Sequence, residues 1–233
     1  MSLVNDRRLE SRSPLGNERV PADAADRGDE FLEPASELVL LVHGLGAPRL
    51  SMAALDWRLR NRGFQTKNWG YPSITAGIQF LAQRLADEIA DLASVRSVRR
   101  LHVVAHSMGS ILTRVALTQQ SFSKLDRVVM LAPPNHGSAA ARLTAPVLSW
   151  LCPPLKELSD DPSSFVNQLP SSWNHHQHEL GVVEAAHDHV VAPESVRLNG
   201  MSDHVVVNSR HGTLPWKRRT LQHVENFLLR GKF

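Results

Sequence analysis

The strongest constraint on the fold is an alternation between short apolar runs and longer segments with helical spacing. Runs that are apolar on both faces are typical of parallel strands covered by helices on both sides. The alternation therefore predicts an α/β domain built around a mostly parallel sheet of about six strands. The expected strands are 37–42, 64–71, 100–105, 127–131, 180–186 and 203–209, and helical spacing covers 51–62, 75–94 and 216–229.

The length of 233 residues and the hydrophobic content of 42% fit one domain with a sizeable core. Residues 1–35 are rich in charge, proline and alanine and lack apolar periodicity, so we expect a loosely ordered polar arm before a domain over 36–233. Residues 133–179 contain no clear strand, and a structureless loop of that length is uncommon in a compact domain. We expect one or two helices there, with 139–176 as a small cap or lid.

Charge and cysteine content narrow the classes of function. The formal net charge of +3 is not concentrated enough to indicate nucleic-acid binding. The only cysteine, Cys152, excludes an intramolecular disulfide, and no apolar run is long enough to span a membrane. The first residues lack the apolar region of a secretion signal, so a cytoplasmic location is expected. The oligomeric state does not follow from the sequence.

Polar and glycine-containing segments follow the expected strands. In open parallel sheets, ligands bind where the carboxyl ends of the strands open into loops. Ser107, Asp188 and His211 therefore fall on one edge of the sheet, and these are the residue types that nucleophilic acyl transfer requires. The segments are HGLG (43–46), HSMG (106–109), APPNHGS (132–138), HDH (187–189) and RHG (210–212).

Ser107 stands between a strand and a helix, where a sharp turn lifts its hydroxyl clear of the backbone. Such a turn needs small residues two positions away on either side, and Ala105 and Gly109 supply them, although glycine is usual at both places. The backbone N–H groups of Met108 and Leu45 are the expected donors to an oxyanion. Serine is also favoured as a helix N-cap, but a cap requires neither the small neighbours nor a histidine on the same edge.

At these residues the chain resembles the compact serine esterases and lipases of the α/β-hydrolase superfamily. The resemblance covers about 37–230 and includes the chain order serine, acid, histidine. It implies a three-layer α/β-hydrolase fold, Ser107 as nucleophile, His211 as general base, Asp188 as its orienting acid, and an oxyanion hole from Leu45 and Met108. It implies no cofactor. The motifs that carry it are LVHGLG, NWGYPS, HVVAHSMGS, VMLAPPNHGS, DHVVAPES and SRHGTL.

Other residues compete for the roles of acid and base. Asp203 opens the strand that His211 follows, so about eight extended residues at roughly 3.3 Å each place it at the wrong end of the sheet. Glu194 serves only if Asp188 is turned away. Three further histidines lie on the active edge: His43 is expected to be structural, His106 to point away from the serine it precedes, and His136 lies in the APPNHGS turn.

Three groups of residues have a plain structural interpretation beside a functional one. Histidines 175, 176, 178, 187 and 189 match no tetrahedral zinc spacing, so we expect a polar loop and no metal. The basic run 217–219 is expected to be a solvated helix face rather than a membrane patch. The apolar residues of the third group line an acyl pocket, form a lid or pack on the sheet as a crossover helix; they are Leu143, Val147, Leu148, Trp150, Leu151 and Leu155.

The sequence thus predicts hydrolysis of a small carboxylic ester, with an apolar acyl group, through an acyl-enzyme. Two alternatives stay open. A thioesterase or amidase keeps the same chemistry on another acylated substrate. A non-catalytic binding protein keeps the fold without turnover.

Overall fold

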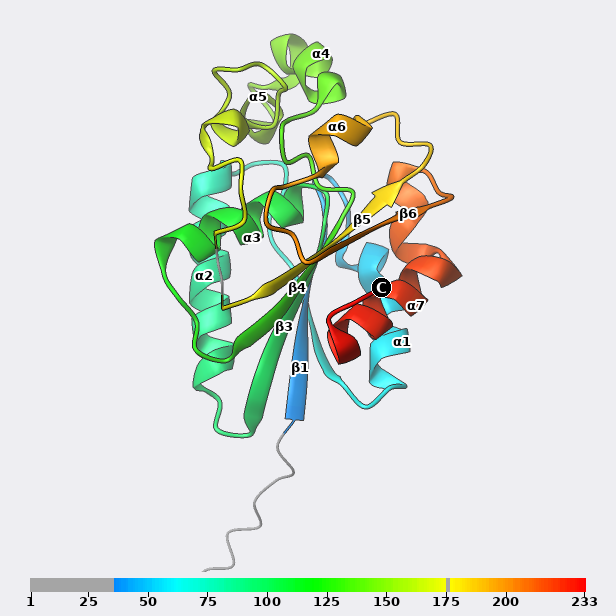
Figure 1. The fold of residues 1–233 in the computed structure, drawn as a ribbon. Helices are drawn as coiled ribbons and strands as arrows, with labels where there is room; N and C mark the ends of the chain where they lie inside the picture. Colours follow the sequence, from blue (N-terminus) through cyan, green and yellow to red (C-terminus); the bar gives the residue numbers. More distant parts are fainter. Residues whose placement is uncertain (1–35, 175–176) are drawn as a thin grey trace, which may run out of the picture. The chain divides into compact units, whose positions relative to one another are not determined.

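A single six-stranded sheet organises the chain (Figure 1). The computed structural model describes residues 36–174 and 177–233, so the arm expected over 1–35 lies outside the described residues. Every pair of neighbouring strands is parallel, in the order β2-β1-β3-β4-β5-β6. The strands are β1 (Ser36–Val42), β2 (Gln65–Trp69), β3 (Val98–His106), β4 (Leu125–Leu131), β5 (Glu179–Ala185) and β6 (Asp203–Val207). The prediction of a mostly parallel sheet of about six strands is confirmed.

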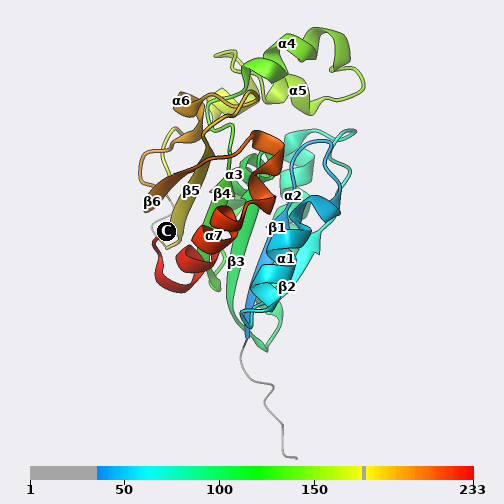
Figure 2. The same cartoon turned by 90° about the vertical axis from the view of Figure 1, so that its right-hand side faces the viewer.

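Helices cover both faces of the sheet, which gives three layers (Figures 1 and 2). Along β1, Leu38, Leu40 and Val42 face the layer with α2 and α3, whereas Val39 and Leu41 face the layer with α1 and α7. This alternation explains why the strand is apolar at every position from Leu38 to Val42. The long helices are α1 (Ala53–Arg60), α2 (Ile78–Ser94), α3 (Met108–Gln119), α4 (Ala139–Leu148) and α7 (Arg218–Arg230).

Residues between β4 and β5 form a separate group of short helices above the sheet (Figure 1). The helices expected within 133–179 are therefore present. The remaining short elements are α5 (Pro154–Glu157), α6 (Pro193–Val196), and the 3-10 turns η1 (Arg49–Met52), η2 (Phe165–Gln168) and η3 (His211–Trp216). Within the described part of the chain, none of the helices combines the length and apolar content needed to cross a membrane.

The start of α3 packs tightly against the end of β1. A Cβ atom on Gly109 would lie 2.6 Å from the carbonyl oxygen of His43 and 2.7 Å from that of Val42. These neighbours are backbone atoms of the sheet, which cannot move as the end of a flexible side chain can. Gly109 is therefore required for α3 to approach β1 this closely.

Replacing Gly109 by alanine is expected to lower the free energy of unfolding. Alanine gains about 1 kcal/mol in helix propensity over glycine, but overpacking against fixed backbone costs about 1–3 kcal/mol. Urea unfolding of Gly109→Ala, beside Gly212→Ala, measures the difference. A Cβ on Gly212 meets no atom within 4 Å, so that variant should be near wild type. Equal stability of the two variants would contradict the packing argument.

Candidate active site

The order of the strands places a switch point between β1 and β3. The chain leaves β1 toward β2 on one side, and later leaves β3 toward β4 on the other. At such a point the loops after the two strands diverge, which opens a crevice at their carboxyl ends. Gly44 follows β1 and Ser107 follows β3, and a Cβ on Gly44 would lie 3.0 Å from that of Ser107. The two loops meet at the expected nucleophile.

Ser107 has a backbone conformation that non-glycine residues rarely adopt. Its φ is 53° and its ψ is −123°, a strained combination that its surroundings must enforce. Its backbone N–H donates to Leu131 O at 2.9 Å, and α3 begins at the next residue. Its side chain makes no capping hydrogen bond to α3. The structure therefore does not support the interpretation of the Ser107 side chain as a helix cap.

Ser107, His211 and Asp188 form a continuous chain of hydrogen bonds. His211 Nε2 lies 2.9 Å from Ser107 Oγ, and His211 Nδ1 lies 2.7 Å from Asp188 Oδ2. The carboxylate fixes the proton on Nδ1, which leaves the lone pair of Nε2 to accept from the hydroxyl. The structure thus brings together three residues that are far apart in sequence.

Asp188 lies in a tight turn after β5 that favours its charged form. Burial alone would raise its pKa, but the hydrogen bond from His211 and the N–H groups of Val191 and Val190 more than offset this, so the pKa is lowered. Those two N–H groups donate to Oδ1 at 2.9 and 2.8 Å, while Oδ2 receives His211. The carboxylate therefore stays ionised and aimed at the imidazole.

The competing acids are engaged elsewhere or exposed. Asp203, at the start of β6, accepts from the N–H of His204 and of Phe233, at the opposite end of the strand from His211. Glu194 lies exposed in α6. In the described part of the chain neither forms a hydrogen bond with His211, so Asp188 is the acid that the geometry pairs with it.

The two expected oxyanion donors come from the loop after β1 and from the start of α3. Among the described residues, none accepts a hydrogen bond from the N–H of Leu45 or of Met108. Met108 is the first residue of α3, where backbone N–H groups have no partner within the helix. Neither N–H group is therefore committed to another part of the described structure.

His106 does not simply point away from the site. Its Nε2 lies 3.1 Å from the carbonyl oxygen of His211, and the two rings lie 4.9 Å apart between centroids. Burial, with a smaller contribution from nearby His211, lowers the pKa of His106 to about 3, so it stays neutral. No local sequence pattern indicates this contact, because it joins residues 105 positions apart.

The other histidines of the edge have structural partners. His43 Nδ1 lies 2.9 Å from Gly44 O, and His136 Nε2 lies 3.1 Å from Arg197 O. Of the five histidines weighed as metal ligands, 175 and 176 lie outside the described residues. In the ranges 36–174 and 177–233, no group of three or more histidine, cysteine, aspartate or glutamate side chains could hold a metal ion.

Helix α4 shows the reverse of the usual amphipathic pattern, in which the large apolar side chains are the buried ones. It buries only small residues, Ala141 and Ala145, whereas its large apolar side chains face outward. This exposure disagrees with a crossover helix packed on the sheet. The exposed side chains of α4 and the residues after it are Leu143, Val147, Leu148, Trp150 and Leu151, between 44 and 77% exposed.

Helix α4 is joined directly to the acid turn. Ser138, the N-cap of α4, accepts from the N–H of Ala141 and donates its hydroxyl to the carbonyl oxygen of Val190 at 2.5 Å. Val190 in turn donates its N–H to Asp188. Hydrogen bonds through Ser138 and Val190 therefore connect the segment above the sheet to the carboxylate of Asp188.

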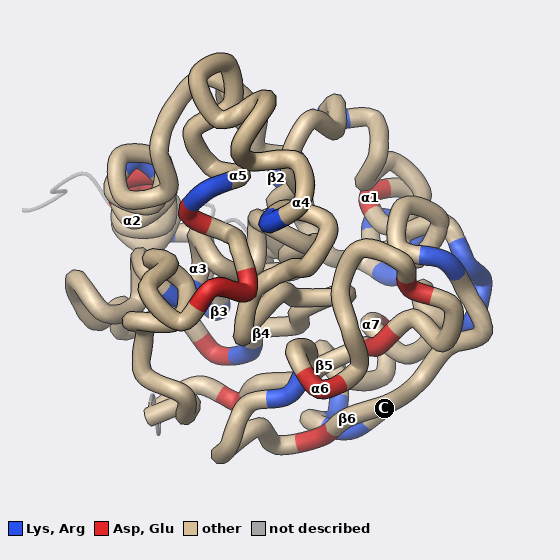
Figure 3. Tube along the Cα trace, turned by 90° about the horizontal axis from the view of Figure 1, so that it is seen from above, with Lys and Arg blue, Asp and Glu red and all other residues tan. Residues whose placement is uncertain are grey.

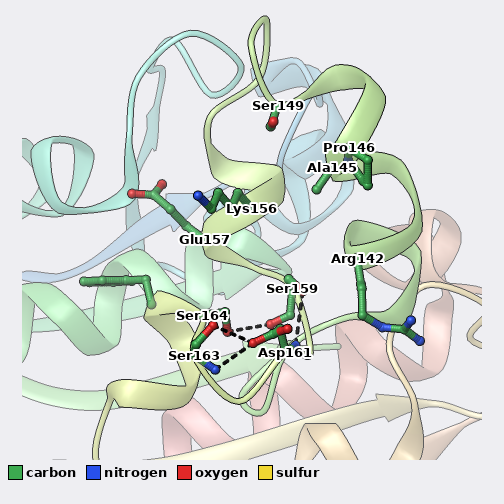
Figure 4. A pocket seen from close by; sticks show the side chains of 11 residues that line it. Arg142, Ala145, Pro146, Ser149, Lys156, Glu157, Ser159, Asp161, Ser163 and Ser164 are labelled. Carbon is green, nitrogen blue, oxygen red and sulfur yellow. Dashed lines mark hydrogen bonds between the residues drawn. The ribbon is translucent and has the colours of Figure 1, made fainter.

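A pocket of about 460 Å³ lies between α4 and α5 (Figure 4). Its polar side chains are largely engaged with one another. Asp161 accepts from the N–H and hydroxyl of Ser163, and Ser164 donates to the carbonyl oxygen of Ser159. None of the three relay residues lines it. Figure 3 looks onto this edge and shows acidic and basic residues interspersed over α4, α5 and α6.

Solved structures with the same arrangement are known lipases and esterases. The mature Bacillus licheniformis lipase BlEst2 superposes with a TM-score of 0.69 at 17% identity, covering 86% of this chain and 94% of that one. The chain has the α/β-hydrolase fold that these structures share. The Pyrococcus furiosus esterase Pf2001 matches this chain with a TM-score of 0.58 at 16% identity, covering 85% and 84% of the two chains.

A third structure comes from a protein longer than this chain. The Aspergillus fumigatus lipase B has a TM-score of 0.58 at 18% identity, and the match covers 77% of this chain but 45% of that one. Residues 33–136 match the family model described as "Putative serine esterase (DUF676)". A comparison with curated protein sequences gave no match. Together the fold and the family match support ester hydrolysis in general terms.

The lowered pKa of Asp188 predicts a pH dependence of stability. A carboxyl group titrates near 3.9 in unfolded chains, so its stabilising contribution is complete above about pH 5 and is lost as the pH falls through the lower folded pKa. The difference in free energy of unfolding between wild type and Asp188→Asn should be largest near neutral pH and shrink in acid. Urea unfolding at a series of pH values measures it. A difference that grows in acid would contradict the prediction.

Proposed function

We propose that the chain hydrolyses carboxylic esters through an acyl-enzyme on Ser107, with His211 as general base and Asp188 as its orienting acid. The observation that supports this most is the unbroken relay of hydrogen bonds from Asp188 through His211 to Ser107. The strained backbone of Ser107 and the unpaired N–H groups beside it add to this support.

The first half-reaction forms the acyl-enzyme. Ser107 Oγ attacks the ester carbonyl carbon while its proton passes to His211 Nε2, and the carbonyl oxygen becomes an oxyanion. The N–H groups of Leu45 and Met108 donate to that oxyanion. When the carbonyl re-forms, the bond to the alcohol oxygen breaks, and His211 gives its proton to the leaving alcohol.

The second half-reaction releases the acid. Water takes the place of the alcohol and attacks the acyl carbon, with His211 accepting a proton from it. The bond between the acyl carbon and Ser107 Oγ then breaks, and the proton returns to Ser107. Asp188 stabilises the imidazolium at each stage and keeps its Nδ1 protonated. No group beyond these residues and water is required.

The nucleophile is tested by removing its hydroxyl. Ser107→Ala should lower the rate on a soluble p-nitrophenyl ester by about 10³-fold or more, because the whole relay acts on that oxygen. A fluorophosphonate probe should label wild type once, at Ser107, and leave the variant unlabelled. The same assay on an acyl thioester and a peptide amide separates the alternatives. Folded wild type that neither labels nor hydrolyses any of these substrates would overturn the proposal.

The substrate is an ester with an apolar acyl group, and residues 139–176 act as a cap that meets it. The outward apolar face of α4 supports this, because large exposed apolar patches mark sites of interaction.

The triple variant Leu143→Gln, Val147→Gln and Trp150→Gln tests the cap. Hydrolysis of long-chain esters should fall by about tenfold relative to a short-chain ester, since roughly 1.5 kcal/mol of apolar contact is lost. Leu229→Gln is the matched control, because Leu229 is 51% exposed in the last turn of α7, where the neighbouring Leu228 accepts a hydrogen bond from Arg127 of β4. An unchanged chain-length profile in the triple variant would contradict a role for α4 in substrate recognition.

A further inference from the structure

The loop after β1 is clamped by side chains from the loop after β2. The end of β2 and the loop after it carry the motif NWGYPS. Two of its residues, Tyr71 and Ser73, are buried and reach across to residues 43–47. Ser107 lies on the other side of that loop, against Gly44. The β1 loop is thus held between the nucleophile and the β2 loop.

Tyr71 holds the first peptide of the loop. Its hydroxyl donates to the carbonyl oxygen of His43 at 2.5 Å, which fixes the plane of the peptide between His43 and Gly44. Its ring stacks between those of His43 and Trp69, with centroids 4.3 and 4.6 Å away. Burial raises the pKa of Tyr71 far above its usual range, so the hydroxyl stays a donor.

Ser73 holds the third peptide of the loop. Its hydroxyl oxygen accepts from the N–H of Gly46 at 3.1 Å, which fixes the plane of the peptide between Leu45 and Gly46. Gly46 has a φ of +64°, a conformation that lets the chain turn at this point. The backbone N–H of Ser73 donates to the carbonyl oxygen of Tyr71 at 2.9 Å, so the two clamping residues are joined to each other.

The peptide between Gly44 and Leu45 lies between these two and carries the N–H group proposed to bind the oxyanion. Its carbonyl, that of Gly44, lies 2.9 Å from His43 Nδ1 and accepts from the N–H of Ala47 at 3.3 Å. Its N–H, that of Leu45, has no acceptor among the described residues. A peptide carbonyl and N–H point in opposite directions, so engaging the carbonyl leaves the N–H turned away from the loop.

We propose that Tyr71 and Ser73 are positioning residues that hold the N–H of Leu45 in the orientation needed to stabilise the oxyanion formed at Ser107. They act through the neighbouring peptide planes and do not touch the substrate. This inference rests on the proposed function, because it gives a catalytic purpose to the Leu45 N–H. Preorganised donors cost no reorientation when charge develops, so the effect falls on the transition state rather than on substrate binding.

The variants Tyr71→Phe and Ser73→Ala each remove one hydroxyl and keep the rest of the side chain. For a soluble short-chain ester, kcat should fall by about tenfold in each, less than the roughly 10²–10³-fold lost with a whole donor, while KM changes little. A trifluoromethyl ketone forms a hemiketal with Ser107, and its carbonyl oxygen becomes an oxyanion. Its inhibition constant should rise by the same factor as kcat falls.

Ser202→Ala is the matched control. Ser202 also accepts a backbone N–H, that of Leu180 at 3.2 Å, but it does so at the amino end of the sheet. This variant should keep the kcat and the inhibition constant of wild type. Titration of active sites with a fluorophosphonate corrects each rate for the fraction of folded protein. If Tyr71→Phe fails to fold, Ser73→Ala still decides the question.

The outcomes separate this inference from the proposed function. Wild type that neither labels nor turns over removes the proposed function and the inference with it. Wild type that labels and turns over, with both variants keeping kcat and ketone affinity, overturns the inference alone. Variants with a raised KM and a lower free energy of unfolding that still bind the ketone as tightly as wild type also overturn the inference. In that case the two hydroxyls would serve only the fold.

Discussion

The close approach of α3 to the end of β1 is the contact on which the rest of the site depends. Parallel strands place their carboxyl ends on one edge, and the reversal of strand order between β1 and β3 opens that edge. Because Gly109 has no side chain, α3 can start against the carbonyl groups of β1, and Ser107 is lifted at a positive φ. The same contact brings the β1 loop beside the serine. One packing constraint thus sets both the nucleophile and the donors around it.

The remaining members of the relay arrive from the other half of the sheet. Asp188 follows β5 and His211 follows β6, so their separation is set by the register of two adjacent parallel strands. The acid turn is further tied to the segment above the sheet through the bond between Ser138 and Val190. A displacement of α4 would therefore be felt at the carboxylate. The segment proposed to act as a cap and the acid proposed to orient the base are thus connected through two hydrogen bonds.

The parts of the molecule that were predictable from sequence are those encoded locally. Strand apolarity, helical spacing and the small residues around Ser107 each reflect the backbone of a few neighbouring residues. The contact of His106 with His211, and those of Tyr71 and Ser73 with the β1 loop, depend on how separate loops meet. The sequence around a tyrosine that follows an edge strand does not indicate which backbone carbonyl its hydroxyl will bind.

The cap shows a different limit of sequence patterns. Periodicity in 139–148 identified an apolar face, and the same pattern is compatible with a pocket, a lid or a crossover helix. The inner face of α4, where only Ala141 and Ala145 are buried, disagrees with the crossover helix and leaves the pocket and the lid as alternatives. The spacing of apolar residues indicates an apolar helix face, but only the tertiary structure shows whether other residues cover that face. Here the described residues leave that face open.

Environment, rather than residue type, distinguishes the one histidine suited to act as a base. His43 and His106 lie on the same edge, but burial lowers the pKa of both, and each has a ring nitrogen directed at a backbone carbonyl. In the described part of the chain neither ring forms a hydrogen bond with a carboxylate, and the charge of nearby Asp188 only partly offsets the effect of burial on the pKa of His106. His211 alone has one nitrogen on Asp188 and the other on Ser107. In the proposed mechanism, a proton taken from the serine is therefore best accommodated on His211.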